Sequence, residues 1–362
     1  MTEAARNLAL FLVYDRPGRA NERPGLARTF FAQRCVSDEQ LNQTIEALRT
    51  VGAYVELFEG EEPFLAALSS GRIQALDRTI KLAYNGIEGG ISIGGFEPGR
   101  KSLIPAIADS YGIVCSNSNA YACALGRHKF HYLTILRAFG ISTPRVWHYR
   151  LLNGWICGMS PPSGTTVIAK STYESWSVGV TERSIFEVDD ACDDRVRSIA
   201  QSIGQSVTVQ EFVSGPEVCV PVFALPDCFT TPAMEVVLGK APGDPTAVMT
   251  IDDNLTKGAV LHRPFAGHER TVRKIAARAI QAFEVLELDA FARIDFRIDD
   301  NGEPWIIDVG VSPGIGSSSS AFTSLSQLGF DHASFLRVVI AASLASKGVL
   351  ASSPAKIQPQ AF

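Results

Sequence analysis

Residues 291–320 read FARIDFRIDDNGEPWIIDVGVSPGIGSSSS, and this stretch decides the fold of the chain. Two runs of alternating apolar and polar residues flank Asn301-Gly302, a pattern typical of a β-hairpin. If Asn301-Gly302 forms a two-residue type I′ turn, Asp300 faces Glu303 and Asp295 lies directly opposite Asp308. The stretch therefore predicts two aspartates side by side on one face of a sheet.

Strand alternation separates this polar face from a core face. The same register sets Arg293 opposite Gly310, on the face of the two aspartates. The residues expected to face the core are Ile294, Phe296, Ile298, Trp305, Ile307 and Val309.

Two like charges that face each other on a sheet destabilise it unless a cation lies between them. Mg²⁺ takes one or two protein carboxylates and completes its shell with water and phosphate oxygens, so Asp295 and Asp308 suit it. The alternative is an exposed hairpin whose charged face is simply hydrated. The following SPGIGSSSS, residues 312–320, favours the metal, because small residues with free backbone N–H groups beside a cation suit anionic oxygens.

The composition is that of an ordinary globular protein with room for two or three domains, at 362 residues and 46% hydrophobic content. A net charge of −5 gives no broad footprint for nucleic acid or an anionic membrane. The N-terminus lacks a signal-peptide pattern, and the apolar run at residues 8–14 is too short to span a bilayer. Seven scattered cysteines without zinc-site spacing indicate buried thiols. We therefore expect a cytoplasmic protein.

The first third of the chain alternates strand and helix signals, which predicts an α/β unit with a parallel sheet covered on both faces. Strands are expected at residues 8–14, 53–58, 79–84 and 113–115, with helices at 37–51, 63–68 and 101–111. Ligands of such sheets bind beyond the carboxyl ends of the strands, where Asn85-Gly86 and Ser116-Asn117 fall.

The rest of the chain predicts two smaller α+β units. One long helix, capped by Ser118 or Asn119, is expected to run to Phe139. Strands follow at residues 145–150, 165–170 and 178–181, then at 207–213, 217–224 and 232–238; helices are expected at 193–203, 269–286, 319–328 and 332–344. The predicted domains are residues 1–118, 119–206 and 207–346, with a tail at 347–362.

The ordered set RIDF, IIDVG and SPG resembles the metal and phosphate block of the ATP-grasp superfamily, in particular its D-alanine-D-alanine ligase branch. The resemblance covers residues 81–344. It implies an N-terminal parallel α/β domain, two α+β domains that clasp ATP, and a homodimer. It also implies ATP and Mg²⁺ as cofactors, with Mn²⁺ as an alternative ion, and small carboxylate and amine substrates.

The resemblance assigns the nucleotide site residue by residue. It implies that Lys129 and Lys170 hold the ATP phosphates, under a mobile loop at residues 171–179 that contains Ser177. It implies that Glu217 binds the ribose and that Lys257 lies near the γ-phosphate. The hinge strand whose backbone reads adenine would contribute Gln210, Glu211, Phe212 and Val213.

The resemblance also assigns the reacting centre. Asp295 and Asp308 match metal ligands, and Arg293 matches the arginine that stabilises the oxyanion of the tetrahedral intermediate, with Ser177 and Lys257 as further catalytic residues. The substrate-binding residues that it implies are Trp176, Asn85, Gly314, Ser317, Ser318 and Ser319. A helix that begins near Ser319 would offer its N-terminal N–H groups to a carboxylate.

Such a site supports the formation of an acyl phosphate from a carboxylate and ATP, followed by attack of an amine. No protein nucleophile is needed, which agrees with the absence of a Ser/His or Cys/His constellation in the sequence.

Several residues depart from the family pattern, and most of them affect the metal or the substrate. Gly310 replaces a metal-binding asparagine, and Asp308 replaces a longer glutamate. Trp176 stands where the family has a small residue facing the first amino acid, and the N-terminal substrate residues have no clear counterpart in DRPGRANERPG.

We therefore expect an ADP-forming carboxylate–amine ligase that does not act on D-alanine and belongs to specialised biosynthesis. One alternative is a relative that binds nucleotide without ligation and acts as a regulatory partner. Another is a kinase that stops at the acyl phosphate.

Overall fold

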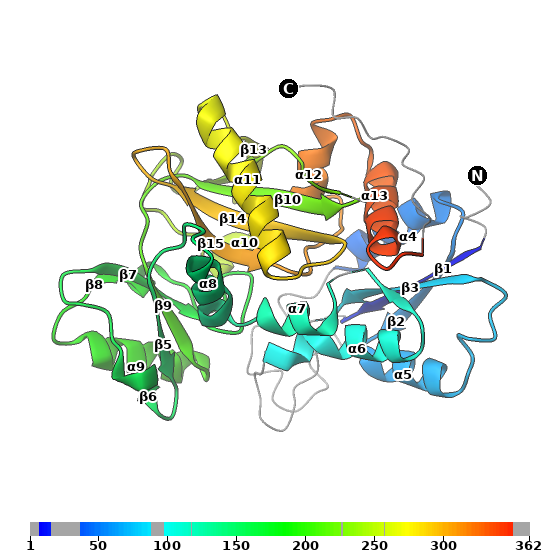
Figure 1. Ribbon diagram of the computed structural model, residues 1–362, viewed down its shortest axis with the longest axis horizontal. Helices are drawn as coiled ribbons and strands as arrows, with labels where there is room; N and C mark the ends of the chain where they lie inside the picture. The colour runs from blue at the N-terminus through cyan, green and yellow to red at the C-terminus, as the bar shows by residue number, and fades with distance from the viewer. Residues whose placement is uncertain are drawn as a thin grey trace.

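The computed structural model describes residues 7–15, 37–87, 98–116, 118–225, 227–256 and 258–349. Three sheets follow one another along the chain. The N-terminal sheet lies on one side of the molecule and the central sheet on the other, with the C-terminal sheet between them (Figure 1).

The N-terminal sheet is entirely parallel, as predicted, and its strands lie in the order β2-β1-β3-β4. The strands are β1 (Leu8–Tyr14), β2 (Tyr54–Glu59), β3 (Ile80–Gly86) and β4 (Val114–Cys115). Every residue of β1 is buried, because helices cover both faces of the sheet.

One face of the N-terminal sheet packs against α4 (Asp38–Thr50) and the C-terminal helix α13 (His332–Ala345). The helices α4 and α13 lie side by side in Figure 1. The other face packs against α5 (Glu61–Ser69) and α6 (Leu103–Ser110), which follows the 3-10 helix η2 (Pro98–Ser102). The Ser37 side chain caps α4 by accepting a hydrogen bond from the Gln40 N–H at 3.3 Å.

The predicted long helix at residues 119–139 is wrong, because two helices occupy this stretch. They are α7 (Ala120–Leu125), capped by Asn119, and α8 (Lys129–Ala138), capped by His128. Gly126 lies at the break, where a Cβ atom would come within 2.1 Å of Val311 Cγ1. The second cap makes Lys129 the first residue of α8.

The central sheet is antiparallel, in the order β6-β5-β9-β7-β8. It contains β5 (Val146–Arg150), β6 (Gly154–Trp155), β7 (Thr166–Ser171), β8 (Ile185–Glu187) and β9 (Val207–Glu211), with η3 (Ile156–Gly158), η4 (Glu182–Ser184) and α9 (Cys192–Ile203). Two expectations are corrected. Strand β9 pairs with β5 and β7 rather than joining the C-terminal sheet, and residues 178–181 form the end of a turn and an irregular segment in place of a strand.

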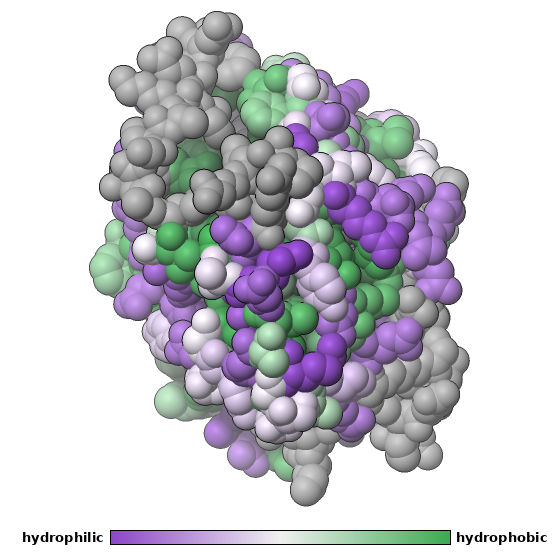
Figure 2. Space-filling view, turned by 90° about the vertical axis from the view of Figure 1, so that its right-hand side faces the viewer, coloured by the Kyte–Doolittle hydropathy of each residue, from purple (hydrophilic) through white to green (hydrophobic). Residues whose placement is uncertain are grey.

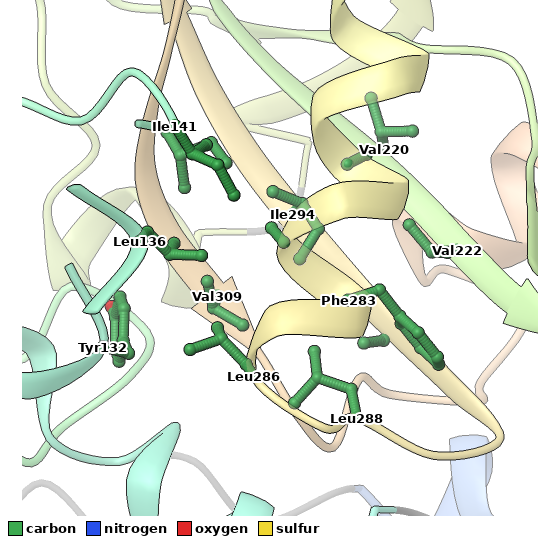
Figure 3. Close-up of a cluster of buried hydrophobic side chains, with 14 of the residues drawn as sticks. Tyr132, Leu136, Ile141, Val220, Val222, Phe283, Leu286, Leu288, Ile294 and Val309 are labelled. Carbon is green, nitrogen blue, oxygen red and sulfur yellow. The ribbon is translucent and has the colours of Figure 1, made fainter. Parts of the chain in front are cut away.

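The C-terminal sheet has the order β13-β12-β10-β14-β15, and β11 pairs with β10. Its elements are β10 (Glu217–Ala224), β11 (Cys228–Thr230), β12 (Met234–Leu238), α10 (Ile251–Leu255), β13 (Val260–Pro264), α11 (Glu269–Val285), β14 (Phe291–Ile298), β15 (Pro304–Gly310) and α12 (Ser320–Ser326). Side chains of α8, α11 and one face of this sheet form a continuous core (Figure 3).

The hairpin β14–β15 brings the two aspartates opposite each other, as predicted. Asp295 pairs with Asp308 and Arg293 pairs with Gly310. The predicted type I′ turn is wrong, because a type I′ turn needs positive φ at both central residues and only Gly302, at φ 72°, has it. The strands close instead at Ile298 and Pro304, one residue out of the expected register.

A β-bulge between Asp295 and Phe296 restores the register, because the extra residue on β15 offsets the different turn. Phe296 consequently pairs with Ile306. Ile306 belongs to the core cluster in place of Trp305 and Ile307, which corrects the predicted core face on β15. The Trp305 indole N–H donates to Asp299 Oδ2 at 3.0 Å.

No helix within the described segments is long and apolar enough to cross a bilayer. Hydrophilic and hydrophobic residues are interspersed on the surface that carries the N-terminal sheet (Figure 2).

Candidate active site

The face of the C-terminal sheet opposite its core gathers the predicted site residues. Arg293 and Asp295 lie on β14, Asp308 on β15, and Glu217 on β10 opposite Arg297. Residues that alternate with them on β14, such as Ile294, point into the core (Figure 3). Alternation along the strands therefore places charged groups on one surface.

Asp295 and Arg293 form a bidentate ion pair. Arg293 Nε lies 2.7 Å from Asp295 Oδ1, and Nη2 lies 2.6 Å from Oδ2. Burial raises the pKa of Asp295 to about 6, although the guanidinium acts to lower it. The carboxylate is therefore ionised at neutral pH. The Arg293 side chain is 34% exposed, so part of it faces the solvent side of the sheet.

Asp308 is held by its neighbours through one oxygen. Oδ1 accepts hydrogen bonds from the Tyr132 hydroxyl at 2.5 Å and from the Val309 N–H at 2.9 Å. Oδ2 lies 3.8 Å from Lys129 Nζ. Burial acts to raise the pKa of Asp308, but Lys129 and Lys170 lower it overall. Oδ2 is thus the oxygen most available to a cation.

The two lysines predicted to hold phosphates converge on this carboxylate from different elements. Lys129 begins α8, and its ammonium donates to the Glu174 carbonyl at 2.5 Å. Lys170 lies on β7, and its ammonium makes no hydrogen bond or salt bridge with any described residue. Burial lowers the pKa of Lys170 to about 8, opposed by Asp308 and Glu217. An anion beside Lys170 would raise this pKa and stabilise the charged ammonium, which suits a phosphate group.

The loop at residues 171–179 follows Lys170. The Ser171 hydroxyl donates to the Val178 carbonyl at 2.9 Å and closes the base of the loop. At its tip Trp176 and Ser177 have φ 60° and 57°, in the left-handed region that is uncommon for residues other than glycine. Asn254 Nδ2 donates to the Trp176 carbonyl at 3.1 Å. The Trp176 residue is 43% exposed.

Strand β9, predicted to be the hinge strand, carries a buried polar group without a hydrogen-bond partner among the described residues. Gln210 is only 1% exposed, yet its Nε2 has no hydrogen-bond partner among the described residues. Lys170 pairs with Thr208, two residues before Gln210, so strand alternation places all three on one face. A buried amide without a partner is costly, so this atom fits a polar ligand such as a nucleotide base.

The neighbouring residues of the hinge are engaged within the protein. The N–H groups of Glu211 and Phe212 donate to the carbonyls of Arg145 and Thr166, each at 2.9 Å. The Glu211 side chain forms an ion pair with Arg145. The Val213 carbonyl accepts a hydrogen bond from Arg297 at 3.3 Å.

A cavity of about 260 Å³ opens next to Glu217, the predicted ribose-binding residue. It is lined by β10, β12, the loop 241–249 and Arg297. Glu217 Oε2 lies 3.8 Å from Arg297 Nη2. The cavity thus continues the functional face away from the aspartates.

Arg297 and Tyr132 are site residues that sequence reasoning missed. Arg297 donates to the Pro245 carbonyl at 3.0 Å and lies 4.9 Å from the centre of the Phe212 ring, so it ties the hinge to the cavity loop. In the sequence RIDFR, Arg297 stands two residues after Asp295, so strand alternation could have predicted that both lie on the same face of the sheet. Tyr132 stands three residues after Lys129 on a helix, which places both on one side.

Two of the predicted substrate residues, Ser317 and Ser318, form hydrogen bonds with α4 of the N-terminal unit. Ser317 Oγ donates to Gln43 Oε1 at 3.1 Å, and Gln40 Nε2 donates to Ser318 Oγ at 3.0 Å. Ser319 caps α12 by accepting from the Phe322 N–H. Gly314 directly follows Pro313, whose carbonyl accepts a hydrogen bond from the Tyr84 hydroxyl at 2.9 Å.

Asn85, also predicted to bind substrate, is fully buried, and its amide donates to the Lys101 carbonyl at 2.9 Å. Lys257 lies outside the described residues, as do residues 16–36, which include DRPGRANERPG.

The donor set fits a divalent cation that shares its shell with a nucleotide. No group of three or more His, Cys, Asp or Glu residues within the described segments could hold a metal by itself. Asp295 and Asp308 supply two carboxylates, and Gly310 adds no side-chain oxygen. Mg²⁺ requires no more than this when phosphate oxygens and water complete its shell.

Comparison with known proteins gives consistent matches. The family model described as D-ala D-ala ligase C-terminus matches residues 161–341, half of the chain. The D-alanine–D-alanine ligase of Pseudomonas putida (strain GB-1) is 24% identical over 323 residues, 88% of this chain and 91% of that protein. The enzyme of the same name from Laribacter hongkongensis is 27% identical over 285 residues, 76% of this chain and 80% of that protein.

Solved structures show the same fold. The D-alanine–D-alanine ligase from Bacillus anthracis complexed with ATP superposes with a TM-score of 0.63 at 15% identity, covering 93% of this chain and 97% of that one. The ligase from Coxiella burnetii gives 0.59 at 13% identity, with 94% of each chain covered. The chain therefore belongs to the ATP-grasp superfamily, as an ADP-forming carbon–nitrogen ligase of the D-alanine–D-alanine ligase type.

Proposed function

We propose that the protein joins an unusual carboxylic or amino acid, other than D-alanine, to an amine in a specialised biosynthetic pathway. The observation that carries the proposal is the convergence of Lys129 and Lys170 on Asp308, beside the ion pair of Asp295 and Arg293. Opposite charges brought together on one face suit the transfer of a phosphoryl group to a carboxylate.

In the first step an oxygen of the substrate carboxylate attacks the γ-phosphorus of ATP. The bond between that phosphorus and the β,γ-bridging oxygen breaks, and ADP leaves with the electron pair. Lys129 and Lys170 bind the phosphate oxygens and neutralise the charge on them. Mg²⁺ held by Asp295 and Asp308 would supply further positive charge to the same oxygens.

In the second step the amine nitrogen attacks the acyl carbon and an amide bond forms. The bond between that carbon and the phosphate oxygen breaks, and inorganic phosphate leaves with the electron pair, while the nitrogen releases one proton to the phosphate or to water. Arg293 has an exposed portion beside Asp295 from which its guanidinium can stabilise the developing oxyanion. All bonds form between the two substrates and ATP, so no covalent intermediate with the protein is required.

Trp176 supports an acid other than D-alanine. Its indole is partly exposed at the tip of the loop next to Lys170, in a left-handed conformation that Asn254 helps to hold. A large aromatic wall there favours an acyl group with apolar or aromatic surface. A homodimer formed through the N-terminal unit is part of the same proposal.

The test is phosphate release from ATP and Mg²⁺ with pooled carboxylic and amino acids, each pool with and without a pool of amines. Release that requires both pools is the expected result, and subdividing the pools identifies the substrates. Release with D-alanine alone would refute the proposed specificity, and release from acids without any amine would indicate a kinase. Trp176→Ser should change the substrate profile; an unchanged profile would remove Trp176 from the acyl pocket.

A further inference from the structure

Glu174 is a buried carboxylate in the middle of the loop at residues 171–179. It is 3% exposed. Its oxygens lie 2.8 Å from Arg100 Nη2, 3.3 Å from Gln205 Nε2 and 3.9 Å from Arg127 Nη2. A carboxylate this deeply buried is stable only with such partners, and losing one of them is costly.

The three partners come from separate parts of the fold. Arg100 lies in η2 of the N-terminal unit, Arg127 lies between α7 and α8, and Gln205 follows α9 of the central unit. In Figure 1, α9 lies in the central unit at the lower left, away from α7 near the middle of the molecule. One side chain of the loop therefore joins the N-terminal unit to the central unit.

The same arginines also hold the residues on either side of Glu174. Arg100 Nη2 donates to the Tyr173 carbonyl at 3.2 Å, and Arg127 Nη1 donates to Ser175 Oγ at 3.1 Å. The loop is thus held at three consecutive residues, 173 to 175. Its tip at Trp176 and Ser177 is held by Asn254, whose Nδ2 donates to the Trp176 carbonyl at 3.1 Å and to Ser177 Oγ at 3.5 Å.

The backbone of Glu174 faces the reacting centre. Its carbonyl accepts the hydrogen bond from Lys129 Nζ, and the same ammonium lies 3.8 Å from Asp308 Oδ2. The Lys129 N–H also donates to the Thr172 carbonyl at 3.2 Å. The position of the Glu174 carboxylate is therefore coupled to the position of the Lys129 ammonium by one short stretch of backbone.

We propose that Glu174 is a positioning residue, whose carboxylate, clamped by Arg100 and Arg127, fixes the loop so that its carbonyl holds the Lys129 ammonium beside Asp308. Through Arg100, the N-terminal unit controls the lysine that binds the nucleotide. The consequence for nucleotide binding rests on the proposed function, whereas the clamp itself does not.

The test compares Glu174→Gln with the wild type in two measurements on the full chain. The glutamine keeps the shape but places a neutral amide between two arginines. Hydrogen exchange of the peptide covering residues 171–179 is expected to accelerate at least tenfold, while exchange in α11 is unchanged. ATP affinity, measured by calorimetry with Mg²⁺, is expected to fall about tenfold.

Glu303→Gln is the matched control. Glu303 is also held by two cations, Lys274 and Arg278, but at the far end of the hairpin. The Glu303→Gln variant should keep the hydrogen exchange of residues 171–179 and the affinity for ATP of the wild type. Glu174→Asp keeps the charge and should recover part of the protection that Glu174→Gln loses.

Gln205→Met provides a milder variant for the case in which Glu174→Gln does not fold. It removes the hydrogen bond from Gln205 Nε2 to Glu174 and the one that Gln205 Oε1 accepts from the Tyr173 N–H, and it leaves both arginines. The same changes are therefore expected at reduced size, at residues beyond Tyr173. Unchanged loop exchange in the folded variants would overturn the clamp. Faster exchange with unchanged ATP affinity would overturn the link to Lys129. A wild type that binds no ATP would refute the proposed function, while the exchange measurement would still decide the clamp.

Discussion

Replacement of Tyr132 by Phe should weaken metal binding without disturbing the fold. The Tyr132 ring is fully buried among the core residues shown in Figure 3, and only its hydroxyl reaches Asp308, at 2.5 Å. Phenylalanine keeps the ring and its packing. The change therefore removes one hydrogen bond to an ionised carboxylate and little else.

Two arguments give the magnitude. A hydrogen bond to a charged group contributes about 1.5–3 kcal/mol. The Val309 N–H still binds Asp308 Oδ1, which places the loss near the lower end, about 1.5 kcal/mol. Residues that orient metal ligands typically affect metal affinity by about 10- to 100-fold. Because about 1.4 kcal/mol corresponds to tenfold, we expect roughly a tenfold weaker affinity for the ion.

The assay is a titration of the protein with Mn²⁺ in the presence of ATP, followed by the paramagnetic resonance of free Mn²⁺. Tyr149→Phe serves as the control, since Tyr149 is also buried and bonded through its hydroxyl, to Arg197 at 3.3 Å, but lies in the core of the central unit. An Mn²⁺ affinity of Tyr132→Phe equal to that of the wild type, in a protein with a normal urea transition, would refute the role of Tyr132.

Four further outcomes are expected. Asp295→Asn should reduce Mg²⁺-dependent ATP turnover by at least about a hundredfold, since metal charge stabilisation is worth several kcal/mol; unchanged turnover, with the fold checked by circular dichroism, would remove the hairpin from the active site. ATP affinity should fall by up to about tenfold per pH unit as the pH rises above about 8. The reason is that burial lowers the pKa of Lys170 to about 8 in the free protein, whereas bound phosphates raise it again. In calorimetric titrations, Lys170→Arg should flatten this dependence of ATP affinity on pH. Gly310→Asn should tighten Mn²⁺ binding severalfold, because a Cβ at this position meets nothing closer than 3.6 Å and the amide oxygen adds a ligand; equal or weaker binding would contradict this placement. Gly126→Ala should lower the free energy of unfolding in urea by about 1–3 kcal/mol, since its Cβ would overlap Val311; an unchanged transition midpoint would show that the helix break tolerates a side chain.

Lys170 also makes the free energy of unfolding depend on pH. Its pKa in the folded protein, about 8, is below its ordinary value of 10.5. The unfolded chain therefore binds more protons between these two pH values, and the contribution of Lys170 to stability rises with pH across this range.

Local sequence patterns determined much of the architecture. The unbroken apolar run of β1 requires helices on both faces of a parallel sheet. The alternation in residues 291–310 placed Asp295 and Asp308 on one face, and both the pairing and its neighbour Arg293–Gly310 were predicted. Period and turn signals depend on adjacent residues, so they can be read from the chain alone.

The register of the hairpin shows where such reasoning ends. The predicted pairing was correct, although the turn type was wrong, because a bulge after Asp295 offset the altered turn. The bulge in β15 depends on how this strand packs against β14 and α11, and no local residue pattern predicts it. The assignment of β9 to the central sheet likewise depends on which strands meet in space.

The contacts that complete the site were decided by tertiary structure alone. Tyr132 reaches Asp308 across 176 positions of sequence, and Arg100 reaches Glu174 across 74. The sequence by itself determined which residue types stand on each strand and helix, through periodicity and capping. Which of these residues meet depends on how the three units pack, because the free energy of a buried hydrogen bond or ion pair arises only when distant segments exclude water around it.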